Sequence, residues 1–201
     1  MNYYVVIRVD DKIIDKILYA IRILVKNQIG DVITPAHITV KGPYKIAMAK
    51  EDLRIENKKI KLTPIKIKGI DTFEINENLI IHFKCNAPQL LSVWDKPSFP
   101  ISKFGYNPHI TLYNNIKGDF SNKLLATLQE YKNIKFTINN IKLVNLSKTY
   151  NYKVLHKKAM KLIKMIAYKY KIENIKTENN RLFLINSLFS LLRIYLKSNP
   201  I

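Results

Sequence analysis

The stretches PAHITV (residues 35–40) and NPHITL (residues 107–112) repeat one pattern in the two halves of the chain. Each places a histidine and a threonine on either side of an isoleucine, between further apolar residues. Side chains two residues apart on a β-strand point to the same face of the sheet. We therefore predict two strands that each present an imidazole beside a hydroxyl: His37 with Thr39, and His109 with Thr111.

The residues around the two motifs point to a known superfamily. KGPY (residues 41–44) follows the first motif, and FGY (residues 104–106) precedes the second. Two His-x-Thr motifs with these neighbours resemble the 2H phosphoesterase superfamily, which includes the RNA 2',5'-ligase and cyclic nucleotide phosphodiesterase group. The resemblance covers residues 2 to 156. It implies an α+β, bilobal fold, with two pseudo-symmetric lobes of antiparallel sheet and outer helices around a central cleft.

Hydrophobic periodicity predicts the elements of the first half of the chain. Pro64 interrupts one of the strands, which favours a place at a sheet edge, and Gly69 marks a turn or bulge after it. Residues 45–60 are ambiguous between a short helix and a loop. The predicted elements are a strand over 3–9, a helix over 13–25 capped by Asp10 or Asp11 and stopped by Gly30, the motif strand over 33–41 ended by Gly42-Pro43, and strands over 62–68 and 79–85.

The second half repeats the alternation of strand and helix. Asn139-Asn140 is a good turn pair, so the strands on either side of it should form a hairpin. This layout also favours two similar lobes that face each other. The predicted elements are a helical start over 88–94, a loop over 95–105, the second motif strand, a helix from Ser121 to about Tyr131, and strands over 134–138 and 141–146.

Composition bounds the class of protein. The chain has 201 residues, 47% of them hydrophobic, which suits one globular domain with an appendage. A net charge of +19 favours polyanionic partners such as RNA or nucleotides, although the composition typical of an AT-rich genome also raises the lysine content. Cys85 is the single cysteine, which fits a reducing compartment. We find neither a signal peptide nor the ~20 apolar residues that span a membrane, and expect a cytoplasmic protein.

The C-terminal part differs from the rest. We divide the chain into a 2H phosphoesterase-like domain over residues 1–156 and a basic helical extension over residues 157–201, which the resemblance does not cover. Two amphipathic helices are expected there, over 157–171 and from Asn179 or Asn180 to 197. Packing of this pair on the main domain is the simplest interpretation. A dimer contact and a membrane-surface helix remain as alternatives.

The paired motifs suit acid–base chemistry at a phosphodiester. One group must take a proton from the attacking hydroxyl or water, and another must give one to the leaving oxygen. Histidine suits both tasks near neutrality, so His37 and His109 are the predicted catalytic residues, in roles that the sequence does not distinguish. Thr39 and Thr111 are the predicted phosphate-binding residues. No cofactor is expected, and no metal set is recognisable, because two of the four histidines lie in the motifs and paired cysteines are absent.

Further substrate contacts are expected near the motifs. Aromatic side chains stack on bases, and a lysine contacts phosphate. The candidates are Lys41, Tyr44, Phe104, Tyr106 and Tyr113, whereas His82 and His156 are interpreted as structural or surface residues. Many members of the superfamily carry a basic residue shortly after the second motif, where this chain has Asn114.

The predicted activity is a metal-independent phosphodiesterase. Its expected substrate is an RNA end or nucleotide with a 2',3'-cyclic phosphate, or a 2',5'-linked phosphodiester. Two alternatives remain open: hydrolysis of a signalling cyclic dinucleotide or of 2',5'-oligoadenylate, as in immune evasion, and an RNA-binding module without turnover.

Overall fold

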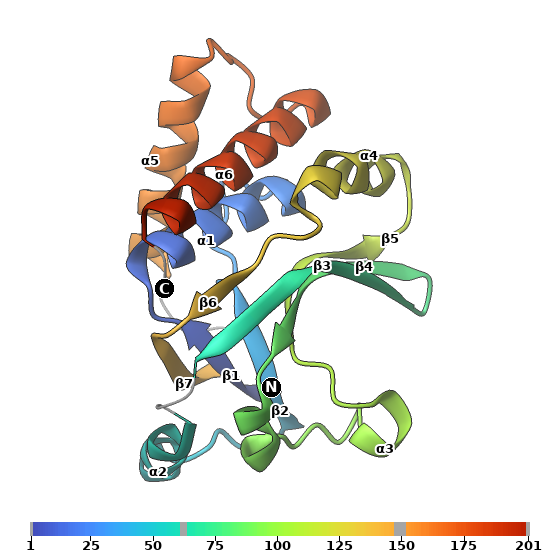
Figure 1. Ribbon diagram of the computed structural model, residues 1–201, viewed down its shortest axis with the longest axis vertical. Helices are drawn as coiled ribbons and strands as arrows, with labels where there is room; N and C mark the ends of the chain where they lie inside the picture. Colours follow the sequence, from blue (N-terminus) through green and yellow to red (C-terminus); the bar gives the residue numbers. More distant parts are fainter. Residues whose placement is uncertain (1, 61–63, 147–151, 200–201) are drawn as a thin grey trace.

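A computed structural model describes residues 2–60, 64–146 and 152–199 as an α+β fold with two antiparallel sheets. Sheet A is three-stranded, in the order β2-β1-β7, and sheet B is four-stranded, in the order β5-β4-β3-β6 (Figure 1). The strands are β1 (Tyr3–Val9), β2 (His37–Tyr44), β3 (Ile65–Ile75), β4 (Asn78–Asn86), β5 (His109–Ile116), β6 (Phe136–Ile138) and β7 (Ile141–Leu146).

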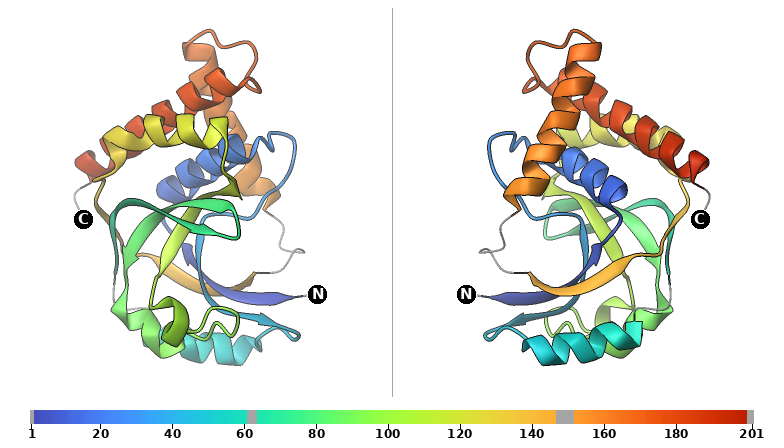
Figure 2. Two further views of the ribbon diagram at one scale, coloured as in Figure 1. Left: turned by 90° about the vertical axis from the view of Figure 1, so that its right-hand side faces the viewer. Right: turned by 90° about the vertical axis from the view of Figure 1, so that its left-hand side faces the viewer.

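Helices cover the sheets unequally. Figure 2 shows α1, α4, α5 and α6 gathered on one side of the two sheets, and α2 on the opposite side. The helices are α1 (Lys12–Lys26), α2 (Lys50–Ile60), the 3-10 helix η1 (Pro88–Val93), α3 (Ile101–Phe104), α4 (Asp119–Leu128), the 3-10 helix η2 (Gln129–Tyr131), α5 (Lys153–Lys169) and α6 (Glu178–Ser198).

The two motif strands are the outer strands of their sheets. β2 pairs with β1 alone among the strands of sheet A, and β5 pairs with β4 alone in sheet B. β2 and β5 also lie in contact with each other across the two sheets. The apolar residues between the polar ones are buried as the alternation predicts, since Ile38 and Ile110 are each 1% exposed.

The Asn139-Asn140 turn does not make a hairpin. β6 joins β3 in sheet B, whereas β7 joins β1 in sheet A, so the turn carries the chain from one sheet to the other. The backbone N–H of Asp10 donates to the carbonyl of Asn140 at 2.7 Å, which fixes this crossing to the end of β1. The predicted hairpin is therefore wrong, because each strand finds its partner far along the chain.

Two strand predictions in the first half also need correction. β2 begins at His37 and continues through Gly42-Pro43 to Tyr44, because the Asp95 segment pairs with its outer edge there. β3 (Ile65–Ile75) lies between β4 and β6, so it is an inner strand, and residues 62 and 63 of the predicted strand lie outside the described residues. The predicted bulge at Gly69 is confirmed: its φ is +130°, and a Cβ there would lie 2.4 Å from the carbonyl oxygen of Lys132.

Helix α1 is the centre of the hydrophobic core. Asp11 caps it, as predicted, by accepting hydrogen bonds from the backbone N–H groups of Ile13 and Ile14. It ends at Asn27, which adopts the left-handed conformation, three residues before the predicted stop. Every residue from Ile17 to Val25 is buried. Because β1, β5, α5 and α6 all contact this helix, it supports both sheets from behind.

The remaining helices refine the sequence predictions. Ser121 lies inside the first turn of α4, where its hydroxyl accepts a hydrogen bond from the Gly118 backbone N–H at 2.9 Å. The ambiguous stretch contains α2, whose Asn57 side chain hydrogen-bonds both backbone groups of Leu143. Asn57 thereby closes the free edge of β7, where an unpaired strand would otherwise invite association.

The C-terminal helices share the core of the main domain. α5 and α6 pack on α1, and α6 also packs on α4. Leu188 and Phe189 are fully buried, and the Tyr131 hydroxyl reaches Asn186 and Ser190 on α6. The predicted boundary after residue 156 falls inside α5. Among the described residues, no helix combines the length and apolar character needed to cross a bilayer.

Candidate active site

His37 is held at the start of β2 by its own backbone. Its Nδ1 lies 2.7 Å from the carbonyl oxygen of Pro35, two residues earlier. A carbonyl can only accept a hydrogen bond, so Nδ1 carries the proton and Nε2 is left as an acceptor. Burial lowers the pKa of His37 to about 4, with a further decrease from the charge of Arg22. The imidazole is therefore neutral at pH 7 in the free protein.

His109 repeats this arrangement on β5. Its Nδ1 lies 2.9 Å from the carbonyl oxygen of Asn107, again two residues earlier. Burial lowers its pKa, the bond to Asn107 raises it, and the ammonium of Lys96 lowers it again. The backbone thus fixes the same tautomer at both motifs and leaves both Nε2 atoms available.

The motif threonines lie beside the histidines, as the strand alternation predicts. Thr39 and Thr111 are half-buried, on the same strand faces as His37 and His109. Within residues 2–60, 64–146 and 152–199, neither hydroxyl forms a hydrogen bond. Each motif therefore offers a free hydroxyl beside a free imidazole nitrogen.

Arg22 of α1 joins the two motif strands, and the sequence analysis did not single it out. Its guanidinium donates to the carbonyl and hydroxyl oxygens of Thr34, which precedes β2, and to the carbonyl oxygen of Thr111 in β5. The residue is 4% exposed, and burial lowers its pKa to about 10. None of these acceptors is a carboxylate, so within the described part of the chain no ion pair neutralises the positive charge beside His37.

Arg8 adds a second cation next to the first motif. Its backbone pairs with His37 across β1 and β2. The guanidinium contacts the Asp15 carboxylate at 2.6 Å, and burial raises the pKa of Asp15 to about 6.

His82 is buried against His109, which the sequence analysis did not foresee. It is 2% exposed, and its ring centroid lies 5.1 Å from that of His109 and 4.9 Å from that of Phe73. The rings of Phe73 and His109 are 5.3 Å apart, so the three form a closed cluster. The sequence shows His82 as a lone imidazole in an apolar strand. Its contact with His109 depends on the pairing of β4 with β5.

Replacing His82 by leucine should reduce the acid sensitivity of folding. Burial, followed by the proximity of His109, lowers the pKa of His82 to about 4. Between about pH 6.5 and 4 the unfolded chain binds a proton at this position and the folded chain does not, so acid favours unfolding. We expect the His82→Leu variant to lose about 2 kcal/mol less stability than the wild type between pH 7 and about pH 5.

Urea denaturation at the two pH values measures this difference. At pH 7 the substitution should cost little stability, because leucine fills a site that is 2% exposed and lies against Phe73. An equal acid-induced loss in both proteins would show that His82 is protonated in the folded state.

The other candidate contacts are engaged with protein groups. Lys41 forms an ion pair with Glu56 of α2 at 2.8 Å, and the Tyr44 hydroxyl binds the Asp95 carboxylate. The Tyr106 hydroxyl donates to the carbonyl oxygen of Ala87, and Tyr113 is buried at 7% exposure. Roles in substrate binding stay predictions for these residues. Phe104 is exposed and packs on Phe99 at 5.3 Å.

Lys26 lies next to Asn114, the position after the second motif at which this chain has no basic residue. Lys26, at the end of α1, lines a shallow pocket together with Asn114 and Asn115. Its charge also reaches His37, whose pKa it lowers. A cation supplied by another element thus stands beside Asn114.

A metal centre and a likeness to known proteins would each bear on the function of this site. Among the described residues, no three His, Cys, Asp or Glu side chains are grouped so that they could hold a metal ion. Comparison of the chain with protein-family models, with curated proteins and with solved structures found no match in any of the three.

Proposed function

We propose that this chain is a metal-independent 2H-type phosphodiesterase that acts on 2',3'-cyclic phosphate or 2',5'-linked nucleotides. The observation that carries the proposal is the matched pair of motifs on two strands in contact. In each motif a backbone carbonyl fixes the imidazole at Nδ1, and a free threonine hydroxyl lies beside it. Two fixed bases with adjacent donors suit proton transfer on either side of one phosphorus atom.

The charges around the histidines favour distinct roles. His37 lies under the influence of Arg22, Lys26 and Arg8, whereas Lys96 is the cation that lowers the pKa of His109. A bound phosphate anion favours protonation of a neighbouring imidazole. Because the pKa of His37 is already about 4, we propose that this proton resides on His109.

The reaction follows from these roles. With a cyclic phosphate, Nε2 of His37 takes a proton from water, and the water oxygen bonds to phosphorus. The bond between phosphorus and one ribose oxygen breaks, and Nε2 of His109 gives its proton to that oxygen. The hydroxyls of Thr39 and Thr111 donate to the non-bridging oxygens, where negative charge develops. For a 2',5' linkage, the neighbouring 3'-hydroxyl replaces water as the nucleophile.

The cations supply the binding energy for the anionic substrate. Among the described residues no carboxylate pairs with the buried Arg22 guanidinium, which bonds Thr34 and Thr111, so its positive charge acts on the site from behind the strands. Lys26 and Lys96 add charges from two further elements. Partly buried charges of this kind act more strongly than exposed ones, because solvent screens them less.

A substrate panel in the presence of EDTA tests the proposal. We expect hydrolysis of a 2',3'-cyclic nucleotide or of a 2',5'-linked dinucleotide, with turnover unchanged by the chelator, because protein groups perform both proton transfers. Chromatography resolves the products, and cyclic dinucleotides and 2',5'-oligoadenylate complete the panel.

Two results would contradict the proposal. Strict dependence of turnover on an added divalent cation would replace the two-histidine mechanism by a metal-assisted one. Binding of RNA without turnover of any substrate, with an affinity that falls steeply with salt, would favour the RNA-binding module instead.

A further inference from the structure

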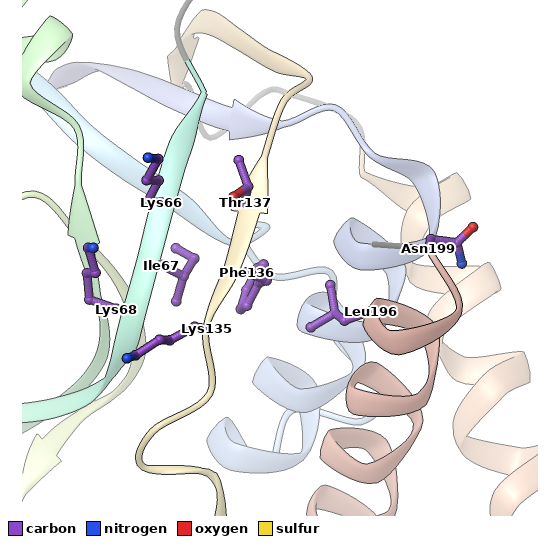
Figure 3. A pocket seen from close by; sticks show the side chains of 8 residues that line it. All are labelled: Lys66, Ile67, Lys68, Lys135, Phe136, Thr137, Leu196 and Asn199. Atoms are coloured by element: carbon purple, nitrogen blue, oxygen red, sulfur yellow. The ribbon is translucent and has the colours of Figure 1, made fainter. Parts of the chain in front are cut away.

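A basic pocket lies on sheet B, away from the two motifs. It has a volume of about 320 Å³ and is formed by β3, the segment that leads into β6, and the end of α6 (Figure 3). Three lysines line it, Lys66 and Lys68 on β3 and Lys135 before β6. In Figure 3 the side chain of Lys135 extends from the segment before β6 toward β3.

Strand register places Lys66, which lines this pocket, on the same sheet face as His109. His109 pairs with Lys84 of β4, and Asn86, two residues further along β4, pairs with Lys66 of β3. Directly paired residues, and residues two apart on a strand, share one face of the sheet. His109, Lys84, Asn86 and Lys66 therefore form one continuous polar surface that crosses β5, β4 and β3.

The charges of the pocket are not compensated. In the parts of the chain that the structure describes, none of the three lysine amines forms an ion pair or a hydrogen bond with protein. The Asp71 carboxylate of β3 is paired with Lys84, whose Nζ lies 3.6 Å from it. Three free ammonium groups around one hollow favour an anionic ligand, and phosphate groups are the matching chemistry.

We propose that this pocket is a second phosphate site, which holds the backbone of a single-stranded oligonucleotide whose reacting phosphodiester lies at the two motifs. The inference rests on the proposed function and narrows its substrate to an oligonucleotide. The site lies two strands across and two residues along from His109, so the two Cα atoms of His109 and Lys66 are about 12 Å apart at ordinary strand spacings. A mononucleotide would occupy only the site at the two motifs, whereas an oligonucleotide would contact both that site and the pocket.

The test compares two triple variants with the same loss of charge. One carries Lys66→Gln, Lys68→Gln and Lys135→Gln. The control carries Lys157→Gln, Lys158→Gln and Lys161→Gln on the exposed face of α5. For each protein, fluorescence anisotropy measures the affinity for a short single-stranded RNA over a range of salt concentrations. Turnover is measured with 2',3'-cyclic AMP and with an RNA that ends in a 2',3'-cyclic phosphate.

The pocket variant should lose RNA affinity and become less sensitive to salt. Loss of three phosphate contacts reduces the slope of log affinity against log salt by about 2 for a single strand. Turnover of the RNA should fall with its affinity, while kcat/KM for 2',3'-cyclic AMP stays at the wild-type value. The α5 control should keep the wild-type slope.

Two outcomes would overturn the proposal. One is equal RNA affinity and salt slope in the pocket variant and the α5 control. The other is binding of inorganic phosphate to the pocket, measured by calorimetry, together with an RNA affinity that does not depend on the three lysines. That result would identify the pocket as a site for free phosphate. RNA binding is measured separately from turnover, so the two proposals can fail independently. A protein that turns over neither substrate would contradict the proposed function. The comparison of RNA affinities would still decide whether the pocket binds RNA.

Discussion

Replacing His37 or His109 by alanine should reduce turnover by about 10²–10⁴-fold in each case, the usual effect of losing general acid or base catalysis. Each imidazole is fixed by a carbonyl at Nδ1 and presents Nε2 as its free proton-transfer atom. Alanine removes that atom and leaves the strand in place, because the buried anchors are Ile38 and Ile110. Initial-rate kinetics on the best substrate of the panel measures the loss.

The controls separate chemistry from folding. His156→Ala removes an imidazole that packs edge-on against Tyr19, away from the motifs, and should leave kcat unchanged. Circular dichroism and thermal unfolding verify that each motif variant folds. Because the two histidines act in one reaction, the double variant should be scarcely slower than either single variant. Wild-type turnover in a folded His37→Ala or His109→Ala protein would exclude the two-histidine mechanism.

Replacing Thr39 or Thr111 by valine should lower kcat by about 10²–10³-fold, the usual effect of losing one preorganised donor at a developing oxyanion. Valine keeps the shape of threonine and removes its hydroxyl. Within the described residues that hydroxyl has no protein partner at either position, so the substitution should cost little stability. The decrease should fall on kcat more than on KM, because the donor acts mainly in the transition state.

Serine at the motif positions and a threonine on the opposite face of sheet B provide the matched controls. Thr39→Ser and Thr111→Ser restore the hydroxyl and should recover much of the lost rate. Thr72→Val, on the exposed part of β3, should leave the kinetics unchanged. A kcat that is the same for valine and for threonine at both motifs would show that these hydroxyls do not contact the reacting phosphate.

The motif strands and the central helix could be predicted because their signals are local. Burial of Ile38 and Ile110 follows from alternation, and the cap at Asp11 follows from a side chain that accepts hydrogen bonds within its own turn. Local signals of this kind need no knowledge of which strand lies next to which. The α+β class with antiparallel sheets was expected from the resemblance of the paired motifs to a known superfamily, and the structure has this class.

The pairing of strands could not be read in the same way. Asn139-Asn140 has the composition of a hairpin turn, yet β6 and β7 belong to different sheets. Only their partners, β3 and β1, distinguish a hairpin from a crossing, and these partners are remote in sequence. The contact of His82 with His109 was missed for this reason, since it arises from the pairing of β4 with β5.

The sequence also contained evidence for the buried position of Arg22, which the sequence analysis did not use. It stands alone among the apolar residues from Ile17 to Val25, on a helix that is buried all round. Such a helix lies inside the protein, so a single charge within it needs internal acceptors or a function. The sequence therefore contained the evidence for a buried cation, while the identity of its acceptors required the fold.

The bonds of Arg22 also determine how the protein responds to acid. Their acceptors are carbonyl and hydroxyl oxygens, which do not titrate. They link the segment that precedes β2 to strand β5. The neighbouring link between Arg8 and Asp15 weakens as the medium falls below about pH 6, where that carboxylate takes up a proton. In an acidified compartment the bonds of Arg22 between the two sheets would persist, whereas β1 and α1 would lose their ion pair. Because burial already disfavours the charged Asp15 carboxylate, its protonation does not by itself destabilise the fold.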